Sequence, residues 1–149
     1  MKQPILIVLF CLFVSFASAQ GLTNDGAVIT ITTGAFVNII GTDGNFLNKD
    51  NGSNIGTLTL SGIMDIKGDW TNNSSGNVLT SGSTGTVTLT GTTQQEIKGN
   101  TATNFYNLLL ANTYGTSPQI SMLVNTNVHH ELTIPATNNI GCNDTALTL

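Results

Sequence analysis

Short stretches in which apolar and polar residues alternate recur along most of this chain. Three of them cover residues 28–32 (VITIT), 57–60 (TLTL) and 86–90 (TVTLT). Each places apolar side chains on one face and threonine on the other, which predicts a half-buried β-strand. Less regular stretches at residues 104–110, 119–124, 128–134 and 146–149 also predict strands. No stretch after residue 19 keeps the helical spacing of apolar residues for more than about one turn, so we expect no helix.

The three alternating stretches belong to a repeated phrase. Thr30, Thr59 and Thr88 occupy the same place in the phrase and are evenly spaced along the chain. Each stretch is followed by a glycine and then by a second short apolar run. A constant period of this length is typical of proteins built from stacked repeats. One such repeat cannot bury its apolar residues alone, so the repeats are expected to stabilise one another.

The period predicts an all-β fold, a right-handed parallel β-helix (β-solenoid) of about four to five rungs. Equivalent strands in successive rungs then lie about 4.8 Å apart. Four rows of stacked residues are expected: Thr30 with Thr59 and Thr88; Ile31 with Leu60 and Leu89; Ile39 with Ile66 and Ile97; and an outer polar row of Asn38, Asp65 and Glu96. An antiparallel sandwich also has frequent turns, but it does not explain the period.

Residues 1–19 have the features of a signal peptide. Lys2 is followed by an apolar run, and Ala17-Ser18-Ala19 is a small-residue cleavage site. The apolar run is about a dozen residues, short of the roughly 20 that a membrane-spanning helix needs. We therefore expect cleavage after Ala19, a repeat domain at residues 20–149 without a membrane span, and a secreted or cell-surface location.

Removing the signal peptide leaves three lysines, no arginine and eight carboxylates, a formal net charge of −5. This charge argues against nucleic acid as a partner, because binding to phosphates requires clustered Lys or Arg, and against anionic membranes. Only Cys142 remains as a cysteine, so an intramolecular disulfide is excluded. We expect Cys142 to lie at a turn; the alternative is a disulfide between two chains.

Four segments carry a resemblance to a known class: residues 68–73 (GDWTNN), 85–91 (GTVTLTG), 94–99 (QQEIKG) and 105–108 (FYNL). They resemble the β-helical repeat regions of large exported, adhesin-like surface proteins of the Bacteroidetes type, and the resemblance covers residues 62–112 best. It implies a secreted or cell-surface protein, and the family frequently uses the type IX export route with a separate C-terminal sorting domain. This sequence departs from that pattern, so it is the N-terminal piece of a longer protein, a truncated gene product or a chain exported by another route. We expect the repeat domain to be incomplete on its C-terminal side. The resemblance implies no catalytic residues.

Candidate chemical sites in the sequence are weak. Asp65 with Asp69, and Asp43 with Asp50, are the acidic pairs considered for glycosidase chemistry. We prefer the interpretation that Asp65 belongs to a solvated outer row and Asp69 to a turn. Parallel β-helices also include lyases that act on acidic sugars, and these use Arg or Lys to neutralise the sugar. The absence of arginine after residue 19 argues against such a lyase. We expect no catalytic, cofactor-binding or metal-binding residues and no cofactor, and hence a protein that is not an enzyme.

The metal candidates are equally weak. His129 and His130 are adjacent, so on a strand they point to opposite faces and cannot chelate one metal together. With Glu131 beside them they form only a weak metal candidate. The turns at residues 43–45 and 50–53 lack the ligand spacing of a calcium loop, which leaves only weak calcium binding at rung corners.

Two surface features suggest binding. Phe46, Trp70 and Phe105 follow the repeated phrase and either stack on sugar rings or, as we prefer, pack at the corners of the coil. The threonine runs 30/32, 57/59 and 86/88 form, if stacked, a flat hydroxyl array of the kind found in ice-binding solenoids, although threonine also suits any exposed strand.

We therefore expect a structural or adhesive module without catalytic function. The alternatives are a carbohydrate-binding or carbohydrate-active β-helix and an ice-binding solenoid. The expected partners are the remainder of a longer surface protein, a second copy joined through an open strand edge at the C-terminal end, or glycans.

Overall fold

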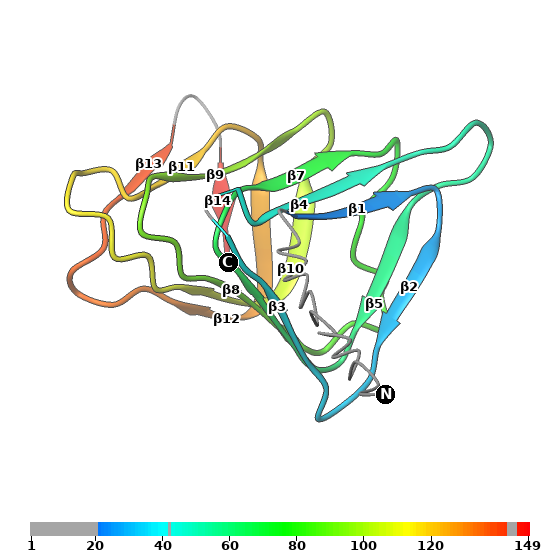
Figure 1. The fold of residues 1–149 in the computed structure, drawn as a ribbon, viewed down its shortest axis with the longest axis horizontal. Helices are drawn as coiled ribbons and strands as arrows, with labels where there is room; N and C mark the ends of the chain where they lie inside the picture. Colours follow the sequence, from blue (N-terminus) through cyan, green and yellow to red (C-terminus); the bar gives the residue numbers. More distant parts are fainter. Residues whose placement is uncertain (1–20, 42, 143–145) are drawn as a thin grey trace, which may run out of the picture.

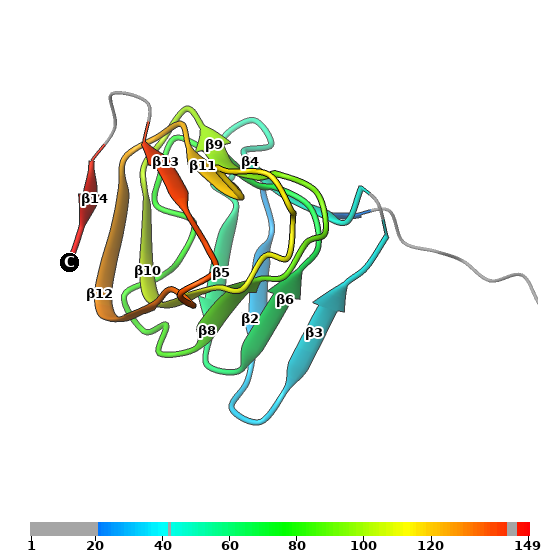
Figure 2. The same ribbon diagram turned by 90° about the vertical axis from the view of Figure 1, so that its left-hand side faces the viewer.

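The computed structural model describes residues 21–41, 43–142 and 146–149. These residues form a right-handed parallel β-solenoid of about five turns, as the alternation and the period predict (Figures 1 and 2). The signal peptide expected at residues 1–19, with its cleavage after Ala19, lies outside the described residues. In the described part of the chain every regular element is a strand, and no helix there could cross a membrane.

Three parallel sheets form the walls of the coil. Sheet A contains β1 (Gly21–Asp25), β4 (Asn45–Lys49), β7 (Trp70–Asn73), β9 (Gln95–Gly99), β11 (Ile120–Met122) and β13 (Ile140–Cys142). Sheet B contains β2 (Val28–Ile31) and β5 (Thr57–Leu60). Sheet C contains β3 (Phe36–Ile39), β6 (Ile63–Ile66), β8 (Thr86–Leu89), β10 (Thr103–Leu110), β12 (Thr126–Thr133) and β14 (Leu147–Thr148). Each pair of neighbouring strands runs parallel because the chain passes once around the coil between them.

The interior of the coil is filled by the apolar side chains of the alternating stretches. Leu58 and Leu60 of β5 point inward and are buried, whereas Thr57 and Thr59 of the same strand are partly exposed. The same alternation in the other strands produces one continuous apolar core along the coil. Each fully buried side chain of this size contributes about 1.5–3 kcal/mol to folding, and neighbouring rungs share that burial.

The repeated phrase is in register over only two of its three copies. Thr30 pairs with Thr59, and Ile31 pairs with Leu60, between β2 and β5 as predicted. The third copy forms β8, which pairs with β6 rather than with β5, so Thr88 lies beside Asp65. The prediction that Thr88 and Leu89 continue the first two rows is therefore wrong.

The other two predicted rows fail at the same copy. Ile39 pairs with Ile66, and Asn38 pairs with Asp65, as predicted. The third member of each row lies on β9 in sheet A instead: Ile97 pairs with Trp70 and Met122, and Glu96 pairs with Ser121.

A loop explains the shift. Residues 50–56 connect β4 to β5 as an excursion that is closed by an antiparallel bridge within it, and this loop lengthens the turn that leads from Thr30 to Thr59. The next turn is shorter, because Thr59 Oγ1 lies beside Thr80 Oγ1, only 21 residues farther along the chain. The third copy of the phrase therefore reaches the next wall of the coil. Equivalent positions in β1, β4 and β7 lie 24 residues apart, which is the more regular period.

Close contact between rungs requires glycine at particular positions. Gly99 pairs with Asn72 and has a φ of 134°, a conformation that other residues rarely adopt. A β-carbon at Gly99 would overlap the backbone carbonyl of Asn72, so only glycine fits there. Gly62 is similarly close to the next rung, because a β-carbon there would overlap the carbonyl oxygen of Ala35.

The first and last turns of the coil differ in cross-section. The turns that contain β1 to β7 have three walls and form a triangle, which Figure 1 shows at the end that carries β2 and β5. Farther along the coil, β10 and β12 are each eight residues long and cover the space of two walls. The first half of β10 lies beside Asn77, because the backbone N–H of Asn104 donates to Asn77 Oδ1 (3.2 Å). The second half of β10 pairs with β8. Figure 2 shows β12 at the left of the coil, between β14 and β10.

Candidate binding site

The three aromatic residues considered for sugar stacking are all in the core. Phe46, Trp70 and Phe105 are fully buried. Their rings form a column, with centroid distances of 4.5 Å from Phe46 to Trp70 and 5.0 Å from Trp70 to Phe105. Trp70 Nε1 donates to Thr103 Oγ1 (3.0 Å), so its polar atom is satisfied. Their interpretation as packing residues is confirmed, although they lie within strands β4, β7 and β10 and not at the corners of the coil. An exposed sugar-binding face made from them is wrong.

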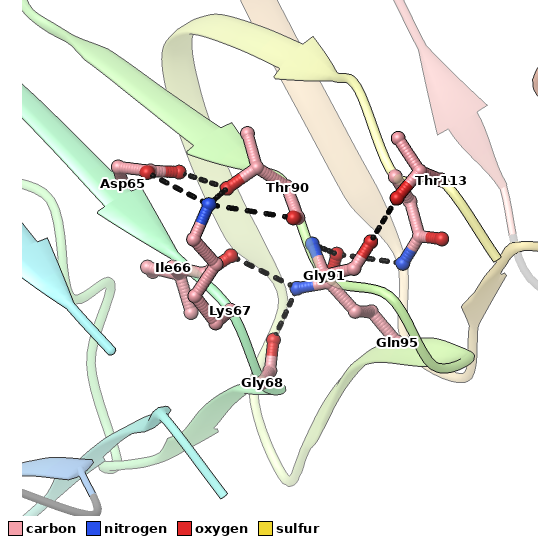
Figure 3. Close-up of polar contacts among 9 residues, drawn as sticks. Asp65, Ile66, Lys67, Gly68, Thr90, Gly91, Gln95 and Thr113 are labelled. Carbon is pink, nitrogen blue, oxygen red and sulfur yellow. Dashed lines mark hydrogen bonds and ion pairs between the residues drawn. The ribbon is translucent and has the colours of Figure 1, made fainter. Parts of the chain in front are cut away.

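Asp65 belongs to a polar cluster at the corner between sheets C and A, drawn in Figure 3. Its carboxylate accepts a short hydrogen bond from Thr90 Oγ1 and lies 3.4 Å from Lys67 Nζ. Lys67 Nζ also donates to Thr90 Oγ1 (2.7 Å). Asp65 is only 9% exposed, so its prediction as part of a solvated outer row is wrong.

Asp69 is held by a different lysine. Its carboxylate lies 2.6 Å from Lys98 Nζ and accepts a hydrogen bond (2.8 Å) from the backbone N–H of Glu96. Burial lowers the pKa of Lys98, but hydrogen bonds to Asp69 and Glu96 and the charges of these two groups outweigh it and raise this pKa above its usual value. Because each carboxylate of the Asp65/Asp69 pair is bound to its own lysine, neither is placed as a free acid or nucleophile.

Asp50 fastens the loop of residues 50–56 to the turn after β7. Its carboxylate accepts a short hydrogen bond from Ser74 Oγ and further bonds from the backbone N–H groups of Ser75 (2.9 Å) and Gly56 (3.3 Å). These donors, above all the Ser74 hydroxyl, lower the pKa of Asp50 to about 2. The oxygens that a calcium ion would need are therefore already bonded to protein donors. In the described residues, no three His, Cys, Asp or Glu side chains gather as a metal site would require.

A β-bulge places the two histidines in an arrangement that differs from the prediction. The register between β10 and β12 changes from Phe105 opposite Val128 to Asn107 opposite Glu131, so β12 has one extra residue beside Tyr106. A bulge re-aims side chains, and both His129 and His130 are exposed. The assumption of a regular strand, with the two rings on opposite faces, is therefore wrong.

The bulge builds an aromatic pair on the outer surface. The rings of Tyr106 and His130 are stacked, with centroids 4.8 Å apart and planes 5° apart. His130 Nδ1 also lies within hydrogen-bond distance (2.8 Å) of Asn107 Oδ1. The ring of Tyr106 is therefore supported on one side and held in a fixed orientation.

Tyr106 and His129 line an open cleft of about 410 Å³. The other lining residues are Asn77, Leu79, Thr80, Ser81, Ser83 and Asn104. The cleft lies where the three-walled turns give way to the long strands β10 and β12, and its volume is in the lower part of the range for ligand sites (about 300–1,000 Å³). The sequence signal for this site is weak, because the bulge that shapes it has no local signature.

The threonine array is smaller than predicted. Thr30 of β2 pairs with Thr59 of β5, and Thr59 Oγ1 lies 2.9 Å from Thr80 Oγ1, so one row continues from the two strands of sheet B to the isolated bridge beside β5. Thr86 and Thr88, by contrast, lie on sheet C, and Thr88 is buried. The predicted flat face with two threonines from each of three copies does not form.

A buried asparagine ladder was missed by the sequence analysis. Asn24 Nδ2 donates to Asn48 Oδ1 (2.9 Å), and Asn48 Nδ2 donates to Asn72 Oδ1 (3.2 Å). The three side chains also bond to backbone groups, for example Asn48 Nδ2 to the carbonyl of Gly56 (2.9 Å). Each is buried, and successive members lie 24 residues apart. That constant spacing of 24 residues could have indicated in the sequence that these asparagines stack on one another.

The remaining buried amides are matched individually. Gln95 Oε1 accepts from the backbone N–H of Gly91 (2.8 Å) and from Asn112 Nδ2 (2.8 Å), and Gln95 Nε2 donates to the carbonyls of Ile66 (3.1 Å) and Gly68. Figure 3 shows Gln95 reaching across from β9 to this corner.

Cys142, expected at a turn, is the exposed last residue of β13.

Comparisons of the chain with protein-family models, with curated proteins and with solved structures find no match. The resemblance to adhesin-like surface proteins therefore rests on the sequence segments that carry it and on the shared β-solenoid architecture. No relative supplies a role for any residue of the cleft or of the polar clusters.

Proposed function

We propose that this chain is an exported structural and adhesive β-solenoid module of a longer surface protein and has no catalytic role. The observation that carries the proposal is how the ionic groups are used. Lys49, Lys67 and Lys98 each form an ion pair with a carboxylate of the described chain. Two of these pairs join neighbouring rungs: Lys49 with Asp25, and Lys98 with Asp69. Charged groups that fasten rungs together suit a scaffold better than an active site.

The export part of the proposal has a direct test. The full chain is produced in a bacterial host, and the exported protein is analysed by intact-mass spectrometry. We expect a chain that begins at Gln20, outside the cytoplasm. Retention of residues 1–19 on a cytoplasmic product would contradict export.

Adhesion is tested with beads coated with the exported protein. We expect these beads to attach to cell surfaces or extracellular polysaccharide more strongly than beads coated with albumin. Incubation with neutral and acidic polysaccharides is expected to release no new reducing ends or unsaturated sugars. Release of either product would contradict a non-catalytic role.

Carbohydrate binding without catalysis is the second candidate function, and the cleft beside Tyr106 is the observation that favours it. A carbohydrate-active enzyme is less well supported, because glycosidases need two carboxyl groups about 5–9.5 Å apart on either side of the substrate. Asp65 and Asp69 are instead bound by different lysines. Ice binding is also less well supported, because the threonine face is incomplete; we expect no thermal hysteresis from the pure protein.

A further inference from the structure

We propose that the cleft beside Tyr106 binds a neutral saccharide at the surface to which the module adheres. This inference rests on the adhesive function proposed above and names the ligand class and the site. The occupant is a neutral hexose or N-acetylhexosamine unit within a longer glycan. Three features of the cleft support it: an immobilised aromatic ring, uncommitted polar groups, and the absence of Lys, Arg, Asp and Glu among its lining residues.

The aromatic ring supplies a platform. Sugar rings carry an apolar C–H face that packs against aromatic side chains, and a ring fixed in advance loses little conformational entropy on binding. Tyr106 is fixed in this way by its stacking on His130, whose Nδ1 is in turn within 2.8 Å of Asn107 Oδ1. The ring of Tyr106 remains partly exposed and lines the cleft.

The polar groups of the cleft suit the hydroxyl groups of a sugar. Asn104 Oδ1 accepts from Asn127 Nδ2 (2.5 Å), which fixes the side-chain amide and leaves its Nδ2 without a partner among the described residues. Ser81 Oγ, Tyr106 Oη and the ring nitrogens of His129 likewise make no hydrogen bond to any described residue. Hydroxyl and imidazole groups both donate and accept, as sugar hydroxyls do.

The lining residues of the cleft argue against phosphate-bearing ligands, acidic sugars and metal ions. None of the eight residues that line the cleft is Lys, Arg, Asp or Glu. Phosphate-bearing ligands and acidic sugars need cationic partners, and the net charge of −5 after residue 19 repels them. A metal ion needs carboxylate or clustered imidazole ligands, which the cleft does not provide. A neutral ligand with many hydroxyl groups fits what remains.

The site is tested by glycan-array binding of the exported protein, followed by calorimetric titration with the best neutral oligosaccharide. We expect neutral glycans to bind in preference to sialylated, sulfated or uronate-containing ones. Tyr106→Ala is expected to weaken binding at least tenfold, and Tyr106→Phe only a few-fold because the ring is retained. Tyr114→Ala, a change in the chain's other tyrosine outside the cleft, is the matched control and is expected to bind as the unchanged protein does.

A second variant keeps the test decisive if Tyr106→Ala fails to fold. Ser81 is exposed in a turn, so Ser81→Lys is tolerated by the fold and projects a long side chain at the cleft. We expect it to weaken binding of the neutral oligosaccharide, whereas Ser53→Lys, in another exposed turn that does not line the cleft, does not.

Several outcomes overturn the proposal. They are preferential binding of acidic glycans, no binding of any neutral glycan, or equal binding by the unchanged protein and a folded Tyr106→Ala variant. If coated beads still adhere while Tyr106→Ala has no effect on adhesion or glycan binding, the saccharide site is wrong and the adhesive function stands. If the beads do not adhere to any surface, the adhesive function is wrong, whatever the glycan array shows.

Discussion

The turns before and after β9 differ in how they hydrogen-bond the polar side chains that stacking buries. In sheet A, β1, β4 and β7 repeat every 24 residues, and the same side chain, asparagine, bonds to its own kind in the next rung. After β7 the rung length varies, and buried amides such as Gln95 and Asn112 find individual partners. The regular turns thus satisfy their buried amides with one repeated hydrogen bond, whereas in the irregular turns each buried amide bonds to a different kind of partner. The candidate cleft lies on the irregular side, where β10 and β12 are joined through a bulge.

The largest effect is expected from the aromatic column that links the two regions. Trp70→Ala removes the ring between Phe46 and Phe105 and should lower the free energy of unfolding by about 3–5 kcal/mol. Urea unfolding followed by circular dichroism measures this change. Phe36→Ala is the control, because Phe36 is 60% exposed and its loss should change stability by about 0.5 kcal/mol or less. Equal losses in the two variants would mean that the column does not join the regions.

The next effect concerns Gly99, where the asparagine ladder ends. Gly99→Ala places a β-carbon against the carbonyl of Asn72 in a backbone conformation unsuited to alanine. The cost should be about 1–3 kcal/mol or more, measured by the same unfolding experiment. Gly115→Ala is the matched control because a β-carbon at Gly115 meets nothing within 4 Å. A neutral Gly99→Ala variant would show that the two regions are not packed as tightly as described.

Breaking the ladder at its middle tests the regular region itself. Asn48→Ala removes the bonds to Asn24 and Asn72 and leaves the buried carbonyl of Gly56 without its side-chain donor. We expect a loss of about 1–3 kcal/mol, observed as a lower midpoint of thermal or urea unfolding. Asn73→Ala, an exposed asparagine on β7, should have almost no effect. A neutral Asn48→Ala variant would remove the distinction drawn between the two regions.

The smallest effect should come from Asp50 and depends on pH. The pKa of Asp50 is lowered to about 2 in the folded chain, from about 3.9 in an unfolded one. Its stabilising contribution is therefore fully present above about pH 4 and is lost as the pH falls through about 2. The midpoint difference between the unchanged protein and Asp50→Asn should shrink between pH 5 and pH 2. A difference that stays constant or grows on acidification would contradict the assignment.

The sequence predicted the type of fold but not the register of its later turns. Alternation in stretches such as residues 57–60 depends on local chain geometry, so strands were correctly predicted from it. Register depends on loop length, and the excursion at residues 50–56 enlarged the period read from the phrase. Asn24, Asn48 and Asn72 were not recognised as core residues, because a buried asparagine must be hydrogen-bonded and the bonds between these three join residues 24 positions apart in the sequence.

The sequence did not reveal the candidate site, because its shape also depends on how the strands pair. Tyr106 and the two histidines adopt their positions through one extra residue in β12, and pairing between strands, not local sequence, decides where that residue is accommodated. The aromatic residues that seemed available, such as Trp70, were instead the best material for the core. Composition and charge narrow the ligand classes, but they do not locate a cleft.

The asparagine ladder also determines how such a coil can grow or shrink. The middle amide, that of Asn48, accepts from Asn24 and donates to Asn72, so the unit that can be copied is one full circuit of 24 residues. Tandem duplication of such a segment inserts another identical link, whereas one extra residue within one of these strands turns its asparagine outward and breaks the chain of amides. Lengthening by whole circuits is therefore the route open to the strands of the first part of the molecule, and other changes in length fit only in the connections between strands, such as residues 50–56.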